Sequence, residues 1–440
     1  MRIWPLSVLV MVPVLIAVVS ATWGAAGAAM APDRYAQIRR DALEHLEEGL
    51  WPFWLHNSVD PEYGGFLTEL NRDGSVRSGD KMLVAQARQI WAFSHMWNAG
   101  YREPRIKEAA QRGLRFLSRH FWDARHEGWF WQCDRDGTPR DMGKRTYGHA
   151  FVIYAATEYH RAFENPYALR VAERTFDALE RHAKDPDSPG YFGSMDREWR
   201  PAGWAAGRTK SMNTQLHLLE ALTRLYGATG KPEHGERLRE VLDILVQKCY
   251  LPQHGCCVEM FSADWTPVPG RRNRYTSYGH NVEMAWLIQE AADALGLPPE
   301  RYREVGLRLI NHALTYGWHE RAGALCSNGP LEGKPSHCSM EWWDQAENLI
   351  ALDWAYRTTG EERYLEALDR QLDWVVTRQS DPTYGGWWDR VSPDGVVISD
   401  RKAHIWHAAY HEVRACLRVG AGEERERTTA HDAAEAQRGE

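Results

Sequence analysis

The sequence predicts an all-α fold, an (α/α)6 barrel with short β-hairpin turns between outer and inner helices. A glycine-centred turn recurs six times at intervals of 62 to 68 residues. Two helical stretches fit into each interval, and the second is the more apolar. Because a fixed period is typical of one supersecondary unit used repeatedly, six half-exposed helices alternating with six buried ones predict two concentric rings. A superhelical array of helical hairpins is the alternative.

The repeated turn combines glycine with aromatic residues, as in Tyr-Gly-Gly-Phe at 63–66 and Gly-Gly-Trp-Trp at 385–388. The copies at 255 and 323 keep the glycine and the spacing but have lost the aromatic residue. Four copies run into polar clusters with Asp-Gly or proline, which favour tight turns. The six glycines are Gly64, Gly128, Gly190, Gly255, Gly323 and Gly385.

The segments between the turns have helical periodicity. Residues 106–121 and 236–246 carry apolar side chains at i, i+3, i+4 spacing, which predicts helices with one buried face. Residues 150–156 and 283–288 are apolar on nearly all sides, which predicts inner helices. Prolines mark expected helix entries or breaks at Pro104, Pro166 and Pro232.

The chain divides into three predicted parts. Residues 1–29 resemble a secretory signal, since Arg2 precedes an apolar run over 6–19 and small residues follow at 26–28. Residues 30–419 are expected to form the barrel catalytic domain, and 420–440 a disordered polar tail. Because the apolar run is short for a membrane span, we expect a secreted or periplasmic protein without a membrane partner after signal cleavage. An uncleaved anchor is the alternative.

Charge and cysteine content exclude several classes of protein. The net charge of −7 argues against a nucleic-acid partner. Seven cysteines without a CxxC pair argue against a zinc ribbon, and their odd number leaves at least one thiol unpaired in a monomer. We expect buried free cysteines. The oligomeric state is expected to be a monomer or a homodimer.

A set of polar and aromatic residues recurs at similar offsets from the repeat glycines, near the start of each inner helix. Equivalent positions in a closed barrel lie at similar heights, so these residues should line the mouth of one cavity. A single histidine there would be read as a hydrogen-bonded core residue, but three in phase favour a site. The set comprises Arg88, Tyr147, His217, His280, Trp342, Glu347 and His411.

Local spacing adds partners to two of these histidines. Asn213 lies four residues before His217, and Glu283 lies three residues after His280, so each pair shares a helical face. A glutamate beside a histidine can orient the ring and raise its basicity. The pair Trp342–Trp343 suits either a core or stacking on a sugar face.

Three histidines near the end of the predicted barrel form a candidate metal site. His404, His407 and His411 have a helical spacing that could ligate zinc. No carboxylate pattern accompanies them, so we predict no metal and no cofactor.

At these residues the chain resembles the N-acylglucosamine 2-epimerase superfamily, and most of all its cellobiose 2-epimerase branch. The matching segments occur in family order and span nearly the whole mature chain. They are 64–66 with 71–74, 87–94, 212–221, 277–283, 342–347 and 406–416.

The resemblance implies a metal-free (α/α)6 barrel that acts on reducing-end sugars through a ring-opened cis-enediol. It implies His280 and His411 as the acid/base pair on opposite faces of C2, and His217 as an aid to ring opening or proton shuttling. Two histidines suit the chemistry, because one base cannot easily reach both faces and an unperturbed pKa of about 6.5 serves both roles. The remaining implied residues are Arg88 and Asn213 for O1 and O2, Glu283 for orienting its histidine neighbour, and Trp343, Glu347 and Trp406 for holding the sugar. Tyr147 and Trp342 are predicted to bind the substrate as well, because their offsets in the repeat place them at the same cavity.

Several residues depart from the family pattern. His407 stands where the family usually has lysine, Ala409 where it has proline, and Gln215 where histidine is common. Trp406, the stacking residue of the disaccharide epimerases, is retained and favours disaccharides, whereas residues 88–91 resemble the monosaccharide branches more.

The predicted function is therefore a sugar 2-epimerase with a small-molecule sugar substrate of the cellobiose type. A mannose isomerase or an N-acylglucosamine 2-epimerase would use the same enediol. An (α/α)6 glycoside hydrolase would need two carboxylates, for which Glu283 and Glu347 are candidates with Asp344 nearby. That alternative leaves the histidines unexplained, as does a catalytically silent sugar-binding barrel.

Overall fold

The computed structural model describes residues 23–202 and 209–421. It contains two compact units, Met1–Gln37 and Ile38–Glu440. Most of the expected signal segment (1–22) and most of the expected tail (422–440) lie outside the described residues. Helix α1, Trp23–Glu44, crosses the boundary between the units. Within the described ranges, no helix has the length and apolar character to cross a bilayer.

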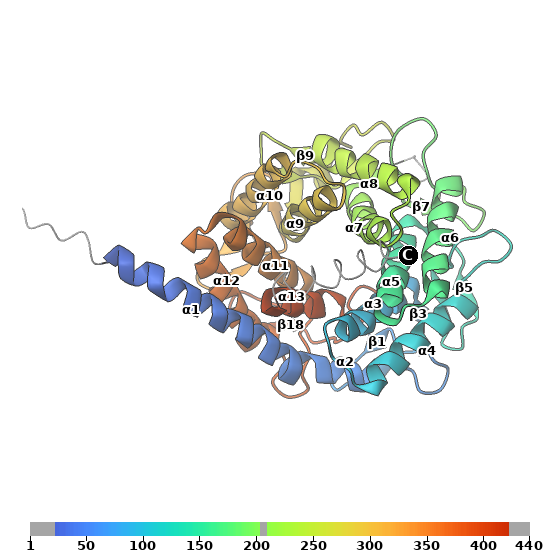
Figure 1. Ribbon diagram of the computed structural model, residues 1–440, viewed down its shortest axis with the longest axis horizontal. Helices are drawn as coiled ribbons and strands as arrows, with labels where there is room; N and C mark the ends of the chain where they lie inside the picture. The colour runs from blue at the N-terminus through green and yellow to red at the C-terminus, as the bar shows by residue number, and fades with distance from the viewer. Residues whose placement is uncertain (1–22, 203–208, 422–440) are drawn as a thin grey trace, which may run out of the picture. The chain divides into compact units, whose positions relative to one another are not determined.

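The unit Ile38–Glu440 is a closed double ring of helices, as predicted (Figure 1). In the described chain the inner helices contact one another in order, and the last packs against the first, so the ring closes and the superhelical alternative does not hold. The inner helices are α3 (Leu83–Asn98), α5 (Thr146–Phe163), α7 (Met212–Thr229), α9 (Tyr278–Ala294), α11 (Trp342–Thr359) and α13 (Tyr410–Ala421).

The outer helices bury one face each and follow the predicted boundaries closely. Three of them begin at the prolines that the sequence marks, since proline at the first helical position loses no intrahelical hydrogen bond. The outer elements are η1 (His45–Leu50), α2 (Trp51–Asn57), α4 (Pro104–His120), α6 (Pro166–His182), α8 (Pro232–Ile244), η3 (Leu245–Cys249), α10 (Glu300–His312), η5 (Ala313–Gly317), α12 (Glu362–Trp374) and η6 (Val375–Gln379).

Short antiparallel strands occupy the connections from outer to inner helices. The strand before an inner helix pairs with a strand of the next repeat, as β3 does with β4 and β16 with β17. This pairing fixes the starts of the inner helices relative to one another. The first strands are β1 (Glu69–Leu70), β2 (Val76–Ser78), β3 (Lys81–Met82), β4 (Gln132–Cys133), β5 (Pro139–Asp141), β6 (Lys144–Arg145), β7 (Ser194–Met195), β8 (Lys210–Ser211) and β9 (Tyr250–Leu251).

The same pattern continues through the second half of the barrel. There β12 precedes α9 and pairs with β15, and a short 3₁₀ segment, η4 (Arg271–Arg274), precedes β12. The remaining strands are β10 (Cys256–Cys257), β11 (Met260–Phe261), β12 (Tyr275–Ser277), β13 (Trp318–His319), β14 (Ala324–Leu325), β15 (Asn328–Pro330), β16 (Met340–Glu341), β17 (Arg390–Val391) and β18 (Val397–Ser399).

Five of the six repeated turns are each tied to an inner helix by a buried polar side chain. Gln86 of α3 accepts from the backbone N–H of Phe66 at 2.9 Å and donates to its carbonyl at 2.7 Å. Such bonds satisfy turn groups that would otherwise be buried without partners. Gln215, one of the departures from the family pattern, serves here by donating to the carbonyl of Tyr191. The other equivalents are His149, Asn281 and Gln345.

Buried lysine–aspartate ion pairs are a second feature that recurs in several repeats, and the sequence analysis did not predict them. Lys144, just before α5, lies 3.2 Å from the Asp123 carboxylate, and both side chains are at most 1% exposed. Arg197 of the following turn binds the same carboxylate through two nitrogens. The equivalent lysine–aspartate pairs are Lys81–Asp60, Lys210–Asp185 and Lys402–Asp381.

The cysteines differ in part from expectation. Cys326 and Cys338 form a disulfide, with their Cα atoms 5.1 Å apart. The next residues along the chain also meet, because the backbone N–H of Ser327 donates to the carbonyl of Ser339 at 3.0 Å. The expectation of free thiols is therefore wrong for this pair. The free cysteines of the described chain are buried, as expected: Cys133, Cys249, Cys256, Cys257 and Cys416.

Candidate active site

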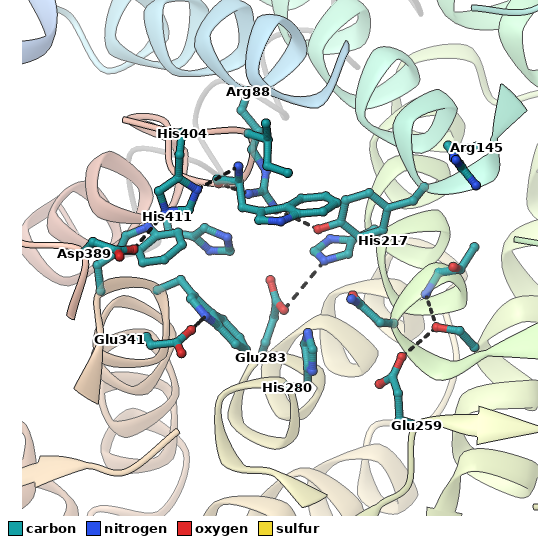
Figure 2. A pocket seen from close by; sticks show the side chains of 18 of the residues that line it. Arg88, Arg145, His217, Glu259, His280, Glu283, Glu341, Asp389, His404 and His411 are labelled. Carbon is teal, nitrogen blue, oxygen red and sulfur yellow. Dashed lines mark hydrogen bonds and ion pairs between the residues drawn. The ribbon is translucent and has the colours of Figure 1, made fainter. Parts of the chain in front are cut away.

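A cavity of about 1000 Å³ lies where the inner helices begin. Figure 2 shows side chains from separate helices and from the loop before α13 converging on it. The predicted site residues that line it are Arg88, Tyr147, Asn213, His217, His280, Glu283, Trp342, Trp343, Trp406 and His411. Glu347 does not line the cavity but lies behind His411.

Two histidines are each held by a buried glutamate. Nδ1 of His411 lies 2.6 Å from Oε1 of Glu347, and Nδ1 of His217 lies 3.0 Å from Oε2 of Glu220. An Nδ1–H that donates to a carboxylate leaves Nε2 as the basic nitrogen. His411 and His217 therefore each have an Nε2 available for proton transfer in the cavity.

Burial keeps the site histidines in their neutral form. Desolvation lowers the pKa of His217 despite the opposing effect of Glu220. Burial also lowers the pKa of His280, and it lowers that of His411 well below its usual range, with Arg88 acting in the same direction. Neutral imidazoles can accept a proton at neutral pH, which is what a general base requires.

The structure gives Glu283 a different neighbour from the one expected. Its Oε1 accepts from Arg414 at 3.0 Å, and its Oε2 lies 4.0 Å from Nε2 of His217. His280 Nδ1 has no hydrogen-bond partner in the described part of the chain, so Glu283 does not orient it. The i, i+3 spacing places both side chains on one helix, but the barrel turns Glu283 inward to Arg414. The predicted orienting contact is thus corrected.

Arg88 and Tyr147 form another part of the cavity lining. Arg88 donates to the hydroxyl of Tyr147 at 2.9 Å and to the backbone carbonyl of Trp406. Burial raises the pKa of Tyr147 to about 12, so its hydroxyl keeps its proton. Since arginine remains charged, Arg88 supplies a fixed positive charge beside the cavity. That charge could stabilise an oxyanion that develops on a bound ligand.

Several buried polar atoms of the cavity lining lack a partner within the residues that the structure describes. Buried polar groups in proteins are almost always hydrogen-bonded, so such a concentration indicates a place where a polar ligand binds. The atoms are Asn213 Oδ1, His280 Nδ1, Glu283 Oε2, Trp342 Nε1, Arg88 Nε, Arg390 Nε and Arg401 Nε.

Aromatic rings extend the cavity toward solvent. The ring of Trp406, which is 40% exposed, lies 5.9 Å from that of Trp131 and 5.8 Å from that of Tyr147. Trp343 also lines the cavity, with its ring 4.7 Å from that of His280. Exposed aromatic faces next to polar groups suit the apolar faces of sugar rings. Trp131 was not predicted as a site residue, although it belongs to a repeated aromatic turn.

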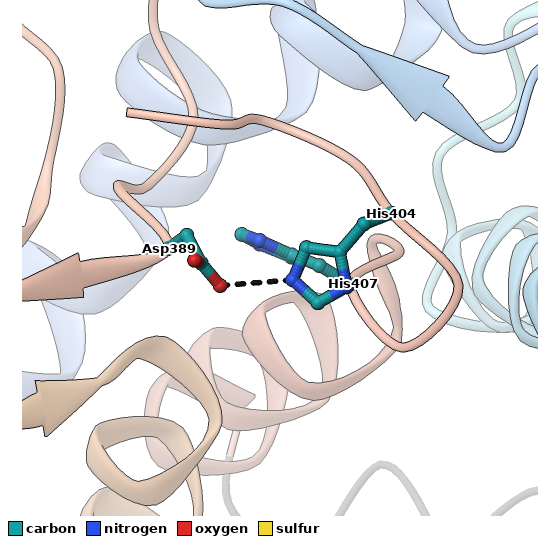
Figure 3. A group of neighbouring side chains, drawn as sticks. All are labelled: Asp389, His404 and His407. Carbon is teal, nitrogen blue, oxygen red and sulfur yellow. Dashed lines mark hydrogen bonds and ion pairs between the residues drawn. The ribbon is translucent and has the colours of Figure 1, made fainter. Parts of the chain in front are cut away.

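The histidines weighed as zinc ligands separate into two clusters. Asp389, His404 and His407 lie together (Figure 3), whereas His411 belongs with Glu283 and Glu347. His404 donates from Nε2 to Asp389 at 2.8 Å, and its Nδ1 accepts from the backbone N–H of Trp406. Coordination of a metal through His404 would break one of these bonds, so hydrogen bonding accounts for the cluster.

Two members of the site escaped the sequence analysis. Glu220 lies three residues after His217, and Arg414 lies three residues after His411. Both are buried, with exposures of 2% and 1%. The i, i+3 spacing that paired His280 with Glu283 would have singled out both.

Comparison with known proteins agrees with the fold. Residues 64–415 match the sequence profile of N-acylglucosamine 2-epimerase (GlcNAc 2-epimerase). A cellobiose 2-epimerase of Bacteroides fragilis is 29% identical over 87% of this chain and 98% of its own. The solved structure of a cellobiose 2-epimerase from Spirochaeta thermophila is 31% identical, with a TM-score of 0.80 over 90% of this chain and 98% of its own.

A third relative represents an isomerase of the same fold. The D-mannose isomerase of Marinomonas mediterranea is 25% identical over 85% of this chain and 95% of its own. The profile match spans far more than half of the sequence, and the relatives are matched over nearly their full length. The chain therefore belongs to the N-acylglucosamine 2-epimerase family of carbohydrate epimerases and isomerases.

Proposed function

We propose that the protein epimerises C2 of the reducing-end sugar of a cellobiose-type disaccharide through a ring-opened cis-enediol. The observation that carries the proposal is a pair of neutral histidines, His280 on α9 and His411 on α13, at one cavity. Bases on separate helices can address opposite faces of one carbon. One neutral histidine removes the proton from C2 and becomes an imidazolium. The other takes up a proton from solvent in the cavity and returns it to the opposite face of the enediolate, after which the first histidine releases its own proton to solvent.

The other residues of the cavity supply what this reaction needs besides bases. Arg88 and Asn213 bind O1 and O2, and the arginine stabilises the negative charge of the enediolate. His217 moves a proton during ring opening, because its Nε2 faces the cavity while Glu220 holds Nδ1. Trp343 packs on the reducing-end sugar.

The size of the cavity supports a disaccharide substrate rather than a single sugar. A volume of about 1000 Å³ is at the upper end for small-molecule pockets. Trp131 and Trp406 offer rings for a second sugar at its outer part. The named cellobiose 2-epimerases among the relatives support the same substrate class.

Proton NMR of cellobiose incubated with the enzyme in D2O tests the proposal. We expect deuterium at C2 and a 4-O-glucosyl-mannose product. Exchange on mannose, glucose or N-acetylmannosamine but not on cellobiose would instead establish the isomerase or monosaccharide epimerase function. Cleavage of a glycosidic bond without exchange would favour the hydrolase. As matched variants, His280→Ala and His411→Ala should each abolish exchange while leaving the circular dichroism spectrum unchanged.

We also propose that the protein acts outside the cytoplasm. The signal-like pattern of residues 1–29 supports export, and so does the Cys326–Cys338 disulfide, because disulfides persist in oxidising compartments. Expression of the full chain with a C-terminal tag, followed by fractionation and N-terminal sequencing, tests this. We expect exported protein that begins near residue 29, and full-length protein in the cytoplasm would contradict the proposal.

A further inference from the structure

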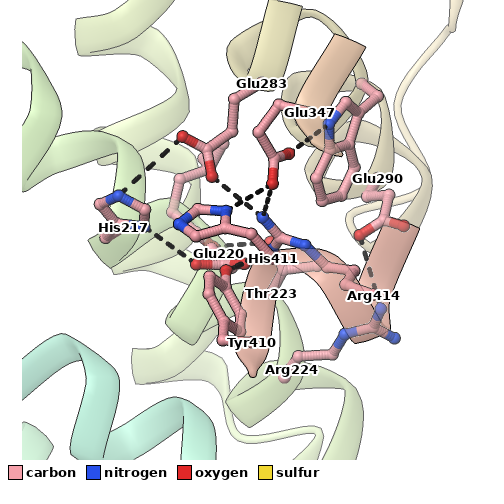
Figure 4. A network of polar contacts seen from close by, with 12 residues as sticks. His217, Glu220, Thr223, Arg224, Glu283, Glu290, Glu347, Tyr410, His411 and Arg414 are labelled. Atoms are coloured by element: carbon pink, nitrogen blue, oxygen red, sulfur yellow. Dashed lines mark hydrogen bonds and ion pairs between the residues drawn. The ribbon is translucent and has the colours of Figure 1, made fainter. Parts of the chain in front are cut away.

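We propose that Arg414 is a positioning residue of the site: its guanidinium binds three buried carboxylates and, through two of them, orients His217 and His411. The proposal deepens the function proposed above and rests on it. Figure 4 shows Arg414 with the carboxylates around it and both histidines beside them.

The contacts of Arg414 connect four inner helices. From α13, its Nη2 donates to Glu283 of α9 at 3.0 Å and to Glu347 of α11 at 2.7 Å. Its Nη1 donates to Glu220 of α7 and to the hydroxyl of Tyr410. A planar guanidinium has several donors in a rigid fork, which a lysine ammonium does not offer. One side chain thereby fixes three carboxylates in space.

Two of these carboxylates hold a histidine by Nδ1. Glu347 binds Arg414 and His411 with the same oxygen, Oε1, at 2.7 and 2.6 Å. Glu220 binds Arg414 with Oε1 and His217 with Oε2. If the arginine moved, each carboxylate would lose the contact that aims it at its histidine.

Arg414 acts through these residues and not on the ligand. It is 1% exposed and is not among the residues that line the cavity. Glu220 and Glu347 do not line it either, whereas both histidines do. Removal of Arg414 should therefore lower kcat and leave the KM for the sugar nearly unchanged.

The charge of Arg414 is also needed inside the barrel. Burial alone would raise the pKa of Glu220, but Arg414 and His217 lower it below its usual range. Burial raises the pKa of Glu283 and Glu347, and Arg414 opposes that rise. Arg414 is therefore the cation that offsets the cost of burying three carboxylates together.

The helix itself supplies a matched control. Arg418 lies one turn further along α13 and packs on the same ring, that of Trp286, at 4.3 Å compared with 4.8 Å for Arg414. It pairs with Glu290 rather than with the three carboxylates of the site. Arg418→Met thus removes a similar side chain from the same helix without touching the histidines.

Steady-state kinetics of C2 proton–deuterium exchange on the sugar that the wild-type enzyme accepts provide the first test. For Arg414→Lys, which keeps the charge but not the fork, we expect kcat to fall at least 30-fold with KM changed less than threefold. Arg414→Met should lose more than 100-fold, because misplaced reacting groups cost about that much. Arg418→Met should stay within twofold of wild type. Equal losses in the Arg414→Lys and Arg418→Met variants would overturn the proposal.

A second readout does not depend on activity. In ¹⁵N-histidine-labelled protein, long-range proton–nitrogen spectra distinguish the two imidazole tautomers. Wild type and Arg418→Met should show His217 and His411 with the proton on Nδ1, and Arg414→Lys should show a mixture. Unchanged tautomers in the Arg414→Lys variant would refute the positioning role. Wild-type protein inactive on every sugar, but with the expected tautomers, would refute the proposed function alone.

Discussion

Replacing Lys144 with methionine measures how much a buried ion pair contributes to the free energy of unfolding of the barrel. Its ammonium lies 3.2 Å from Asp123 in a site that is almost fully buried. At that distance the gross attraction is about 5 kcal/mol for an effective dielectric constant of about 20. Desolvation offsets much of this, but removal of one partner leaves a buried charge, which typically costs 3–5 kcal/mol.

The neighbours of Asp123 narrow the expected loss of stability. In Lys144→Met, Asp123 keeps Arg197, which binds it at 2.8 and 3.2 Å, and it keeps the backbone N–H of Arg125 at 3.1 Å. We therefore expect a loss near the lower end, about 3 kcal/mol. Arg197 is 37% exposed, so Arg197→Met should cost about 1 kcal/mol or less.

Urea unfolding followed by tryptophan fluorescence gives both values in one assay. The free energy of unfolding in water, with m unchanged, should rank wild type above Arg197→Met and Arg197→Met above Lys144→Met. The reasoning would be refuted if Arg197→Met lost as much as Lys144→Met. A loss below about 0.5 kcal/mol for Lys144→Met would refute it as well, since that is the range of ordinary surface substitutions.

Three further outcomes are expected. Burial lowers the pKa values of the site histidines, so they become protonated only at a pH below the usual 6.5. The acid limb of a kcat/KM–pH profile should therefore lie below pH 6.5. An inflection at or above pH 6.5 would contradict the assignment. Trp406→Ala should reduce kcat/KM at least tenfold more on cellobiose than on mannose, and equal losses on both would remove the second-sugar role. Burial alone would raise the pKa values of Asp60 and Asp381, but Arg135 and Arg72, together with the paired lysines, lower them to about 2. Between about pH 4 and pH 2 the unfolded chain therefore binds more protons than the folded protein does. The free energy of unfolding, measured by urea titration, should fall as the pH falls through that window.

Much of the candidate site followed from the period of the sequence. His217, His280 and His411 occupy similar offsets from their repeat glycines, and the closed ring brings them to one cavity. The i, i+3 rule proved less specific. It named Glu283 as the partner of His280, whereas the barrel joins Glu283 to Arg414.

The contacts that the sequence left open connect distant segments. Glu347 meets His411 across 64 positions, and Arg414 meets Glu220 across 194. The lysine–aspartate pairs and the Cys326–Cys338 disulfide are local by comparison, with Lys144 and Asp123 21 positions apart and the two cysteines 12 positions apart. Helical periodicity encodes neither kind of contact, because it shows which face of a helix is buried and not which side chains meet.

The sequence by itself determined the architecture and which residues gather at the cavity of the candidate site. The recurring turn defines the repeated structural unit, and helical periodicity shows which face of each helix is buried. Similar offsets from the repeat glycines show which residues lie at the same height in the barrel. Only the tertiary structure decided which carboxylate holds which histidine and which cation joins them. The physical reason is that each helix adopts its own rotation in the closed ring. That rotation is set by packing against both neighbours and the outer helices, not by local sequence.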